Sequence, residues 1–349
     1  MKIAQVAPLY ESVPPKLYGG TERIVSYLTE ELVRQGHQVT LFASGDSVTQ
    51  ARLVEVCARS LRLNQECVDQ LAHHIVLLEQ VFRQANAFDL IHFHIDYLHF
   101  PLSIRQHIPT VTTLHGRLDL PDLVPVYQMF PSMPVVSISD AQRAPLPWVN
   151  WQGTVYHGLP RDLYTFREIP GAYLAFLGRI APEKGVEQAI AIAQHVGMPL
   201  RIAAKVDRAD REYFREVVQP LLQHNSLVEY IGEVGENDKD VFLGEAYALL
   251  FPINWPEPFG LVMIEAMACG TPVIAYPRGA VPEVLEDGVT GWIVEGIEEA
   301  VQAVERVPAL SRACCRQVFE ERFSASRMAH DYLRIYKSLV EGRSGRVAA

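Results

Sequence analysis

The sequence predicts an α/β protein built from two doubly wound domains, and three observations support this prediction. Apolar strands alternate with amphipathic helical stretches along nearly the whole chain, which is typical of a parallel sheet with helices on both faces. This alternation starts twice, once at residues 2–7 and again at residues 173–177. The third observation is size: 349 residues are too many for one ordinary hydrophobic core, and 49% of them are hydrophobic, enough to fill two cores.

The first half begins with a complete βαβ unit. Residues 2–7 form a strand, and Thr21 is expected to cap a helix whose apolar positions recur at helical spacing. A second strand follows at residues 38–43, and residues 50–86 are predicted to be helical. Further strands are predicted at residues 90–94, 110–114 and 135–139.

The second half repeats this organisation after a looser, polar stretch at residues 153–170, which we interpret as a linker. The predicted domains cover residues 1–160 and 171–325, and a final helix at residues 326–345 is expected to pack back on the first domain. Because two open sheets that face one another leave a cleft, the site is expected to be deep and shared. Strands are predicted at residues 173–177, 200–204, 227–231, 248–251 and 272–275.

The stretch from Asn254 to Ala275 carries the strongest functional signal. Glu257 lies in a short loop, a helix is predicted from Phe259 to Cys269, and Glu265 lies eight residues after Glu257. Eight residues span about 12 Å along a helix, close to the separation between the sugar and the ribose of a nucleotide-sugar. The alternative is an ordinary strand-to-helix crossover whose acidic residue complements the helix dipole.

Backbone and cationic groups beside these carboxylates are suited to phosphate. The N–H groups of Phe259, Gly260 and Leu261 would lie unpaired at the predicted helix start, where anions bind. Arg179 and Lys184 follow the strand at residues 173–177, and two cations there could clamp a diphosphate in place of a metal ion. The alternative for these two residues is a loop with exposed basic side chains.

These motifs resemble the retaining glycosyltransferases of family 4. The resemblance rests on Gly178-Arg179-x4-Lys184-Gly185 and Glu257-Pro-Phe-Gly-x4-Glu265, and it extends to Gly19-Gly-x-Glu22 and Leu114-His115-Gly116. It covers nearly the whole chain and is greatest with the avilamycin-type branch. The resemblance implies the GT-B fold: two Rossmann-like doubly wound domains with a deep interdomain cleft.

The resemblance also implies roles for individual residues. Arg179 and Lys184 would hold the diphosphate, Glu265 the ribose hydroxyls and Glu257 hydroxyls of the transferred sugar, with His115 beside the anomeric carbon. The predicted catalytic residues are therefore His115, Glu257, Arg179 and Lys184. The predicted donor-binding residues are Gly19, Gly20, Lys205, Glu236, Phe259, Gly260, Leu261 and Glu265.

Acceptor-side residues are expected in the first half of the chain. Strand alternation would place His92, His94 and Asp96 on one side of the strand that they end. A metal triad is conceivable there, but a polar cleft lining is the preferred interpretation, and no metal is predicted. The acceptor-side candidates are Tyr10, Tyr18, His94, Asp96 and Arg117.

Composition narrows the partners and the compartment. A net charge of −10 argues against nucleic acid and anionic membranes, and no apolar run reaches the ~20 residues of a membrane span. The five scattered cysteines indicate reduced thiols, so a cytoplasmic protein is expected.

These features and the family resemblance imply a metal-independent, retaining hexosyltransferase that moves a sugar from a nucleoside diphosphate, expected to be UDP, to a hydroxyl of a small-molecule or glycan acceptor. No cofactor is expected beyond this co-substrate. Two alternatives remain: a nucleotide-sugar epimerase on the same scaffold, and a nucleotide-sugar binding protein without catalytic activity.

Overall fold

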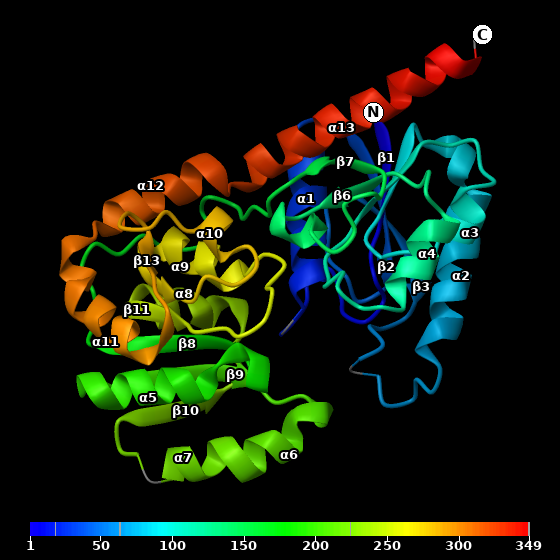
Figure 1. Ribbon diagram of the computed structural model, residues 1–349. Coiled ribbons are helices and arrows are strands. Elements are labelled where there is room, and N and C mark those ends of the chain that lie inside the picture. Colours follow the sequence, from blue (N-terminus) through cyan, green and yellow to red (C-terminus); the bar gives the residue numbers. More distant parts are fainter. Residues whose placement is uncertain (18, 63, 224, 348–349) are drawn as a thin grey trace. The chain divides into compact units, whose positions relative to one another are not determined.

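The chain folds into two compact units, each with its own sheet. The computed structural model describes residues 1–17, 19–62, 64–223 and 225–347. Unit 1 comprises Met1–Pro160 and the chain from Ala325 onward, and unit 2 comprises Arg161–Ser324. Each unit contains one sheet of parallel strands flanked by helices (Figure 1). The prediction of two doubly wound α/β domains is confirmed.

Unit 1 contains a seven-stranded parallel sheet in the order β3-β2-β1-β4-β5-β6-β7. Its strands are β1 (Lys2–Val6), β2 (Gln38–Ser44), β3 (Arg52–Cys57), β4 (Leu90–Phe93), β5 (Thr110–Thr113), β6 (Val135–Ser137) and β7 (Trp151–Thr154). Its α-helices are α1 (Gly20–Arg34), α2 (Gln70–Arg83), α3 (Phe100–Ser103), α4 (Leu123–Met129) and α13 (Ala325–Val347).

Alternation along β1 explains how this sheet is covered on both faces. Ala4 and Val6 belong to a buried apolar cluster that also contains Leu77, Leu78 and Val81 of α2. Gln5 points to the opposite face, where its side chain bonds to Tyr336 of α13. The last helix of the chain therefore completes the fold of unit 1.

Unit 2 contains a six-stranded parallel sheet in the order β10-β9-β8-β11-β12-β13. Its strands are β8 (Tyr173–Arg179), β9 (Leu200–Lys205), β10 (Val228–Gly232), β11 (Ala246–Phe251), β12 (Val273–Ala275) and β13 (Gly291–Ile293). Its α-helices are α5 (Val186–Val196), α6 (Arg211–Tyr213), α7 (Gln219–Gln223), α8 (Glu236–Gly244), α9 (Leu261–Cys269), α10 (Val281–Val284), α11 (Gly296–Arg306) and α12 (Arg312–Arg322).

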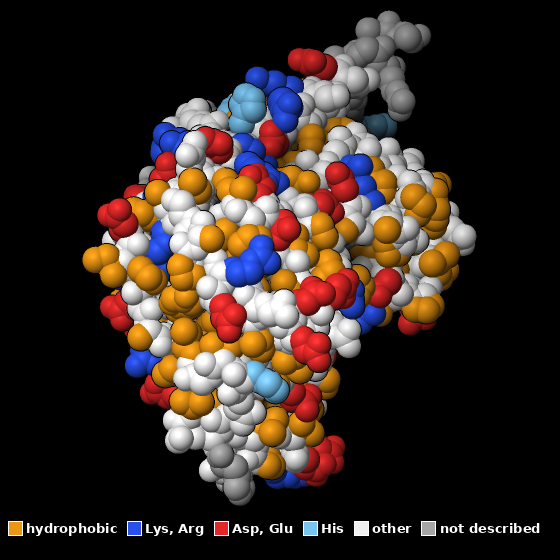
Figure 2. Space-filling model, turned by 60° about the vertical axis from the view of Figure 1, so that its left-hand side comes forward, with side chains coloured by type: hydrophobic (Ala, Val, Ile, Leu, Met, Phe, Trp, Pro, Cys, Tyr) orange, Lys and Arg blue, Asp and Glu red, His pale blue; other side chains and the backbone are white. Residues whose placement is uncertain are grey.

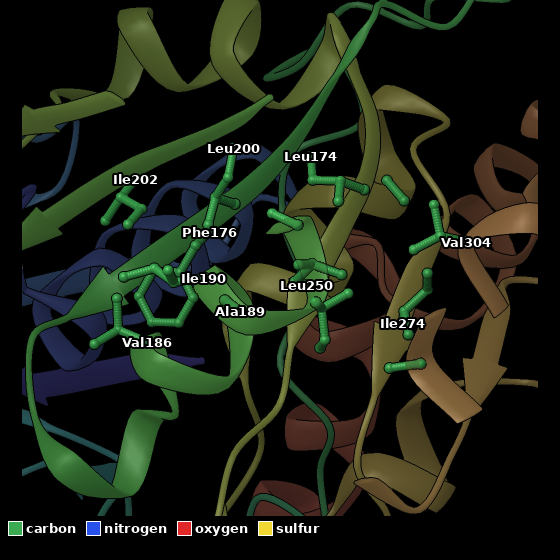
Figure 3. Packing of buried hydrophobic residues seen from close by; sticks show 14 of the residues in the cluster. Leu174, Phe176, Val186, Ala189, Ile190, Leu200, Ile202, Leu250, Ile274 and Val304 are labelled. Atoms are coloured by element: carbon green, nitrogen blue, oxygen red, sulfur yellow. The ribbon is translucent and has the colours of Figure 1, made fainter. Parts of the chain in front are cut away.

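The core of unit 2 lies between its sheet and helices α5 and α11. Figure 3 shows strand residues such as Phe176 and Leu250 directed at Val186 and Ile190 of α5, and Val304 of α11 belongs to the same buried cluster. Because both faces of the central strands β8 and β11 are covered, these strands are apolar almost throughout rather than alternating. This rigid core holds the loops that follow β8 and β11.

The predicted helix at residues 50–86 is wrong over its first part. Residues 52–57 form β3 at the edge of the sheet, and the helix of this region is the shorter α2. The sequence of β3, Arg-Leu-Val-Glu-Val-Cys, is rich in β-branched residues, and its side chains are mostly half-buried. Strands β7 and β13 were not predicted, because Trp-Gln-Gly-Thr and Gly-Trp-Ile each contain a glycine, which is depleted in strands.

Two surface properties bear on the partners of the protein. On the face shown in Figure 2, basic and acidic side chains are interspersed rather than gathered into one basic field. No helix in the described part of the chain is long and apolar enough to cross a bilayer.

Candidate functional site

In both sheets the strand order reverses at one point, and the predicted residues gather there. The reversal lies between β1 and β4 in unit 1 and between β8 and β11 in unit 2. Open parallel sheets bind ligands beyond the carboxyl ends of their strands at such a point. Arg179 ends β8 and Glu257 follows β11, while His94 follows β4 and His115 follows the neighbouring β5.

Lys184 and Glu257 form an ion pair backed by an aromatic ring. Lys184 Nζ lies 2.6 Å from Glu257 Oε2, and Trp255 Nε1 donates to the same oxygen at 3.0 Å. The ammonium also lies 4.6 Å from the centroid of the Trp255 ring. Only 17% of the Lys184 side chain and 12% of the Glu257 side chain are exposed, so water screens the pair weakly. Sequence reasoning did not identify Trp255.

Gly185 allows the loop after β8 to approach the segment after β11. Its φ is +75°, and a Cβ atom there would lie 2.0 Å from the carbonyl oxygen of Pro252. Replacing Gly185 by alanine should therefore lower both stability and turnover. The backbone strain alone should cost about 1–3 kcal/mol of folding stability, and the clash with Pro252 should add to this cost. Gly197→Ala is the matched control for a urea titration and an activity assay.

Gly197 has a φ of +71°, but no atom lies within 4 Å of its Cβ position. Gly197→Ala should thus show the cost of the left-handed backbone alone and keep normal turnover. Equal effects of the two substitutions would contradict the close-approach role of Gly185.

Arg179 lies among carboxylates rather than alone. It is 2.5 Å from Glu183, 3.3 Å from Asp210 and 3.8 Å from Asp207. Lys205, at the end of β9, lies 2.7 Å from Asp207. The predicted donor residues Arg179 and Lys205 are therefore brought together at one charged strand edge. A phosphate arriving there would exchange with these carboxylates.

Glu265 is a deeply buried carboxylate with one unmatched oxygen. Its side chain is 2% exposed, and Oε1 lies 2.8 Å from Nζ of Lys239 on α8. Oε2 is buried and has no hydrogen-bond partner among the residues that the structure describes. A buried carboxylate normally satisfies both oxygens, so Oε2 is an unusual, unsatisfied acceptor in the described structure. Lys239 was missed by sequence reasoning, while Glu236 on the same helix accepts from the Tyr164 hydroxyl.

The helix that carries Glu265 starts later than predicted. Helix α9 begins at Leu261, because Gly260 adopts a φ of +82° that ends the preceding loop. Phe259 and Gly260 therefore precede the helix, and the helical path from Glu257 to Glu265 that suggested a 12 Å separation is wrong. Glu257 is held instead by the loop after β12, since its carbonyl oxygen accepts from the Ala280 N–H at 2.9 Å.

In unit 1, the half-buried His115 lies against the buried histidines His94 and His157. Its Nε2 is 2.9 Å from Nδ1 of His94, and its ring is nearly parallel to that of His157 at 5.4 Å between centroids. Burial lowers the pKa of His115 to about 3, so the ring is neutral at physiological pH. His115 thus contributes hydrogen bonding rather than positive charge.

Two of the acceptor-side candidates lie near each other, because burial and the neighbouring carboxylate of Asp96 raise the pKa of Tyr10. Tyr10 is 47% exposed, and its ring lies 4.9 Å from His74. Arg117 makes a two-point contact with Asp119 at 2.6 and 2.7 Å, and Asp96 adopts a φ of +51° past the end of β4. His94 is buried. Tyr18 lies outside the described residues.

Gly19, just before α1, plays a steric role. A Cβ atom on Gly19 would lie 2.7 Å from Cβ of Pro15, so only glycine fits where the long loop folds back. Gly19 is the N-cap and Gly20 the first residue of α1, and no side chain caps the helix, so the prediction that Thr21 caps it is wrong.

The ring nitrogens of His92 and His94 are engaged in hydrogen bonds. The two ring nitrogens of His92 contact Tyr336 and Thr113, and those of His94 contact Gln5 and His115. Among the described residues no group of three potential ligands has a geometry that could hold a metal ion.

Comparisons with known proteins agree with this architecture. Residues 169–313 match the family model of group 1 glycosyl transferases, and residues 18–152 match that of glycosyltransferase family 4. An uncharacterized glycosyltransferase of Methanocaldococcus jannaschii is 24% identical over 98% of this chain and 99% of its own length. The alpha-maltose-1-phosphate synthase of Mycolicibacterium smegmatis is 30% identical over 185 residues, 48% of each chain, so this match spans about half its length.

Solved structures show the same fold. AviGT4, a glycosyltransferase involved in avilamycin A biosynthesis, superposes with a TM-score of 0.77 at 24% identity over 98% of both chains. The Anabaena protein HepE in complex with UDP superposes with a TM-score of 0.74 at 19% identity, covering 97% of this chain and all of its own.

Proposed function

The chain belongs to the glycosyltransferases of group 1 and family 4, and we propose that it moves a sugar from a nucleoside diphosphate to a hydroxyl acceptor. In this proposal the anomeric configuration is retained and no metal ion is required. The observation that carries it is the Glu265 carboxylate. One of its oxygens is fixed by Lys239 and the other is buried without a partner in the described structure. A ribose hydroxyl could satisfy that oxygen with a charge-assisted hydrogen bond.

The ion pair of Lys184 and Glu257 supports the same proposal. A diphosphate is a stronger partner for Lys184 than one carboxylate, because it carries more negative charge. We propose that the donor draws the ammonium to its phosphate and leaves the Glu257 carboxylate to accept from sugar hydroxyls. Arg179 would add a second cation after exchanging its carboxylate partners. Charge developing on the leaving phosphate would then meet preorganised cations without a metal ion.

The proposed role of His115 fits its neutral state. A neutral imidazole beside the anomeric carbon can orient a hydroxyl, and it adds no charge that would oppose an oxocarbenium-like centre. The acceptor's proton would pass to the leaving phosphate oxygen on the same face of the sugar, which gives retention without a covalent intermediate.

UDP is the proposed nucleotide. The support for this choice is HepE, a protein of similar fold whose structure was solved in complex with UDP. The proposed acceptor is a small molecule or glycan in the cytoplasm. The acidic net charge of −10 supports an acceptor free in solution over one held at an anionic membrane.

A thermal-shift panel of UDP-, GDP- and ADP-sugars tests donor binding. A ligand at 100 times its dissociation constant should add about 2.7 kcal/mol to the stability of the folded state. Glu265→Gln should raise the dissociation constant of the preferred nucleotide at least about tenfold, because a hydrogen bond to a charged group contributes about 1.5–3 kcal/mol.

Asp240→Asn is a suitable control for Glu265→Gln. It removes a partly buried ion pair with Arg167, 2.9 Å long, from the helix that also carries Lys239. Its nucleotide affinity should stay at the wild-type level. If both variants bound the nucleotide equally well, Glu265 would not hold the ribose.

A further inference from the structure

A continuous chain of hydrogen bonds, buried except at its last, partly buried bond, connects helix α13 to His115. Tyr336 of α13 receives the Gln5 Nε2–H at 3.2 Å, and Gln5 Oε1 lies 2.8 Å from Nε2 of His94. Nδ1 of His94 then lies 2.9 Å from Nε2 of His115. Gln5, His94 and Tyr336 are at most 2% exposed, so water does not compete for the first two bonds, and the bond to His115 is partly buried.

The orientation of the Gln5 amide determines where each proton lies. Its Nε2 donates to Tyr336, so its Oε1, which can only accept, faces His94. Nε2 of His94 must therefore carry a proton. Burial lowers the pKa of His94 well below its usual value, so the ring is neutral and Nδ1 is left as an acceptor.

The same reasoning extends to His115. Because Nδ1 of His94 accepts, Nε2 of His115 must donate to it across 2.9 Å. A neutral ring carries one proton, so Nδ1 of His115 has a bare lone pair. This atom is buried and has no hydrogen-bond partner among the described residues. The other arrangement, with the amide reversed, would place an unmatched N–H at the same position.

We propose that Gln5 and His94 are positioning residues that hold His115 in its Nε2–H tautomer, so that Nδ1 accepts a hydrogen bond from a substrate hydroxyl. Tyr336 fixes the amide of Gln5, and the C-terminal helix thereby sets the tautomer of His115 within unit 1. This inference rests on the proposed function for the identity of the hydroxyl, which belongs to the donor sugar or the acceptor. The tautomer itself is a property of the resting protein.

The titratable and charged groups around this chain come from three sides of unit 1. His92 of β4 lies beside His94, with ring centroids 4.0 Å apart. On the other side, the ring of His157 stacks on that of His115. Helix α13 contributes Tyr332, Tyr336 and the Arg327–Asp331 ion pair at 2.7 Å. Burial lowers the pKa of His92 and of His157 well below the usual value, so both are neutral neighbours.

Gln5→Glu should make the activity depend on pH. A carboxylate beside His94 favours its protonated form, which donates from both nitrogens. Nδ1–H of His94 would then face Nε2 of His115 and move the His115 proton to Nδ1. The kcat of Gln5→Glu should fall at least tenfold from pH 9 to pH 6 and recover when the pH is raised, while wild-type kcat should change far less.

Nitrogen-15 NMR of the full-length protein without substrate reads the tautomer directly. Nδ1 of His115 should carry no proton in the wild type and should gain one in Gln5→Glu at low pH. A second variant, Tyr336→Phe, keeps the ring but frees the amide, and should give a mixture of the two tautomers. A protonated Nδ1 in the wild type would overturn the proposal, as would a Gln5→Glu profile parallel to that of the wild type.

Ser103→Ala is the matched control. It removes a buried hydrogen bond of 2.6 Å to His99. His99 is a neutral histidine of the same unit, but it does not belong to the hydrogen-bonded series from Tyr336 to His115. It should lower stability and leave the pH profile and the His115 tautomer unchanged. The tautomer is measured without donor, so it is independent of the proposed function. If His115 showed the Nε2–H tautomer but the protein released no nucleotide, the proposed function would be refuted and the tautomer proposal would stand.

Discussion

Replacing Lys184 by alanine should lower kcat by about 10²–10³-fold, the loss typical of removing one preorganised group that stabilises developing charge. Lys184 lies 2.6 Å from Glu257 and against the ring of Trp255, so its ammonium is held in a poorly hydrated place. A cation there acts strongly on a leaving phosphate. Donor saturation curves separate the effect on kcat from the effect on KM.

One further variant shows whether the position of this cation matters. Arg201 is another cation of unit 2, but its ion pair with Glu229, 3.0 Å long, is exposed. Arg201→Ala should keep wild-type kcat, because exposed pairs contribute little. A kcat for Lys184→Ala equal to that of Arg201→Ala would remove Lys184 from the mechanism.

Glu257→Gln should have different effects on the binding of the nucleotide and on the transfer of the sugar. The substitution releases Lys184 from its partner, so free nucleoside diphosphate should bind at least as tightly as it does to the wild type. Transfer of the sugar should nevertheless fall, since Glu257 is proposed to accept from sugar hydroxyls. Calorimetry with the free nucleotide, beside turnover with the whole donor, measures both effects. Weaker binding of the nucleotide alone would contradict this division of roles.

Acidification below about pH 6.5 should destabilise unit 1 steeply. Burial lowers the pKa of seven histidines of this unit: His37, His74, His92, His94, His99, His115 and His157. These side chains bind protons in the unfolded chain below about pH 6.5 but stay neutral in the folded one. Stability therefore rises with pH in this range and falls as the pH drops.

The size and the limits of this effect follow from His115, whose pKa is lowered to about 3. Each such histidine costs about 1.4 kcal/mol of stability per pH unit between about pH 6.5 and its folded-state pKa. Glu22 acts in the opposite direction, because burial raises its pKa to about 7. Between about pH 7 and 4.5 the folded state binds the additional proton, so Glu22 offsets part of the loss.

Hydrogen exchange of the β1, β4 and β5 amides at pH 7, 6 and 5 reports on unit 1 alone. Protection should fall with pH in the wild type and fall more steeply in Glu22→Gln, which lacks the opposing group. Constant protection from pH 7 to pH 5 would show that the histidines titrate normally.

The sequence was a good guide to the alternating framework and a poor guide to element ends near glycine. Apolar strands such as Lys2–Val6 and Leu200–Lys205 lie where their composition predicted them, because complete burial demands continuous apolar runs. The predicted start of α9 was two residues too early. Phe259 has an acceptable helix propensity, but the positive φ of Gly260 keeps the residues before Leu261 out of the helix. Helix propensity is a property of single residues. The conformation of this loop depends instead on a contact distant in sequence, the hydrogen bond from the Ala280 N–H to the Glu257 carbonyl oxygen.

The candidate site divides in the same way. Lys184, Glu257 and Glu265 were found because they stand in motifs of fixed spacing. Trp255 and Lys239 have no such signal, and they join the site only through contacts made in the folded unit. The histidine chain was beyond prediction for a further reason, since Gln5 and Tyr336 lie 331 residues apart.

Release of nucleoside diphosphate is the measurement that tests the central claim most directly. The protein is incubated with UDP-, GDP- and ADP-sugars, with and without an acceptor panel, and the mixture is followed by chromatography and proton NMR. We expect free nucleoside diphosphate, UDP first, together with a glycoside that keeps the anomeric configuration of the donor. An isomerised donor with no nucleotide released would indicate an epimerase, and an intact donor bound without any reaction would indicate an inactive binding protein. Either result would contradict sugar transfer.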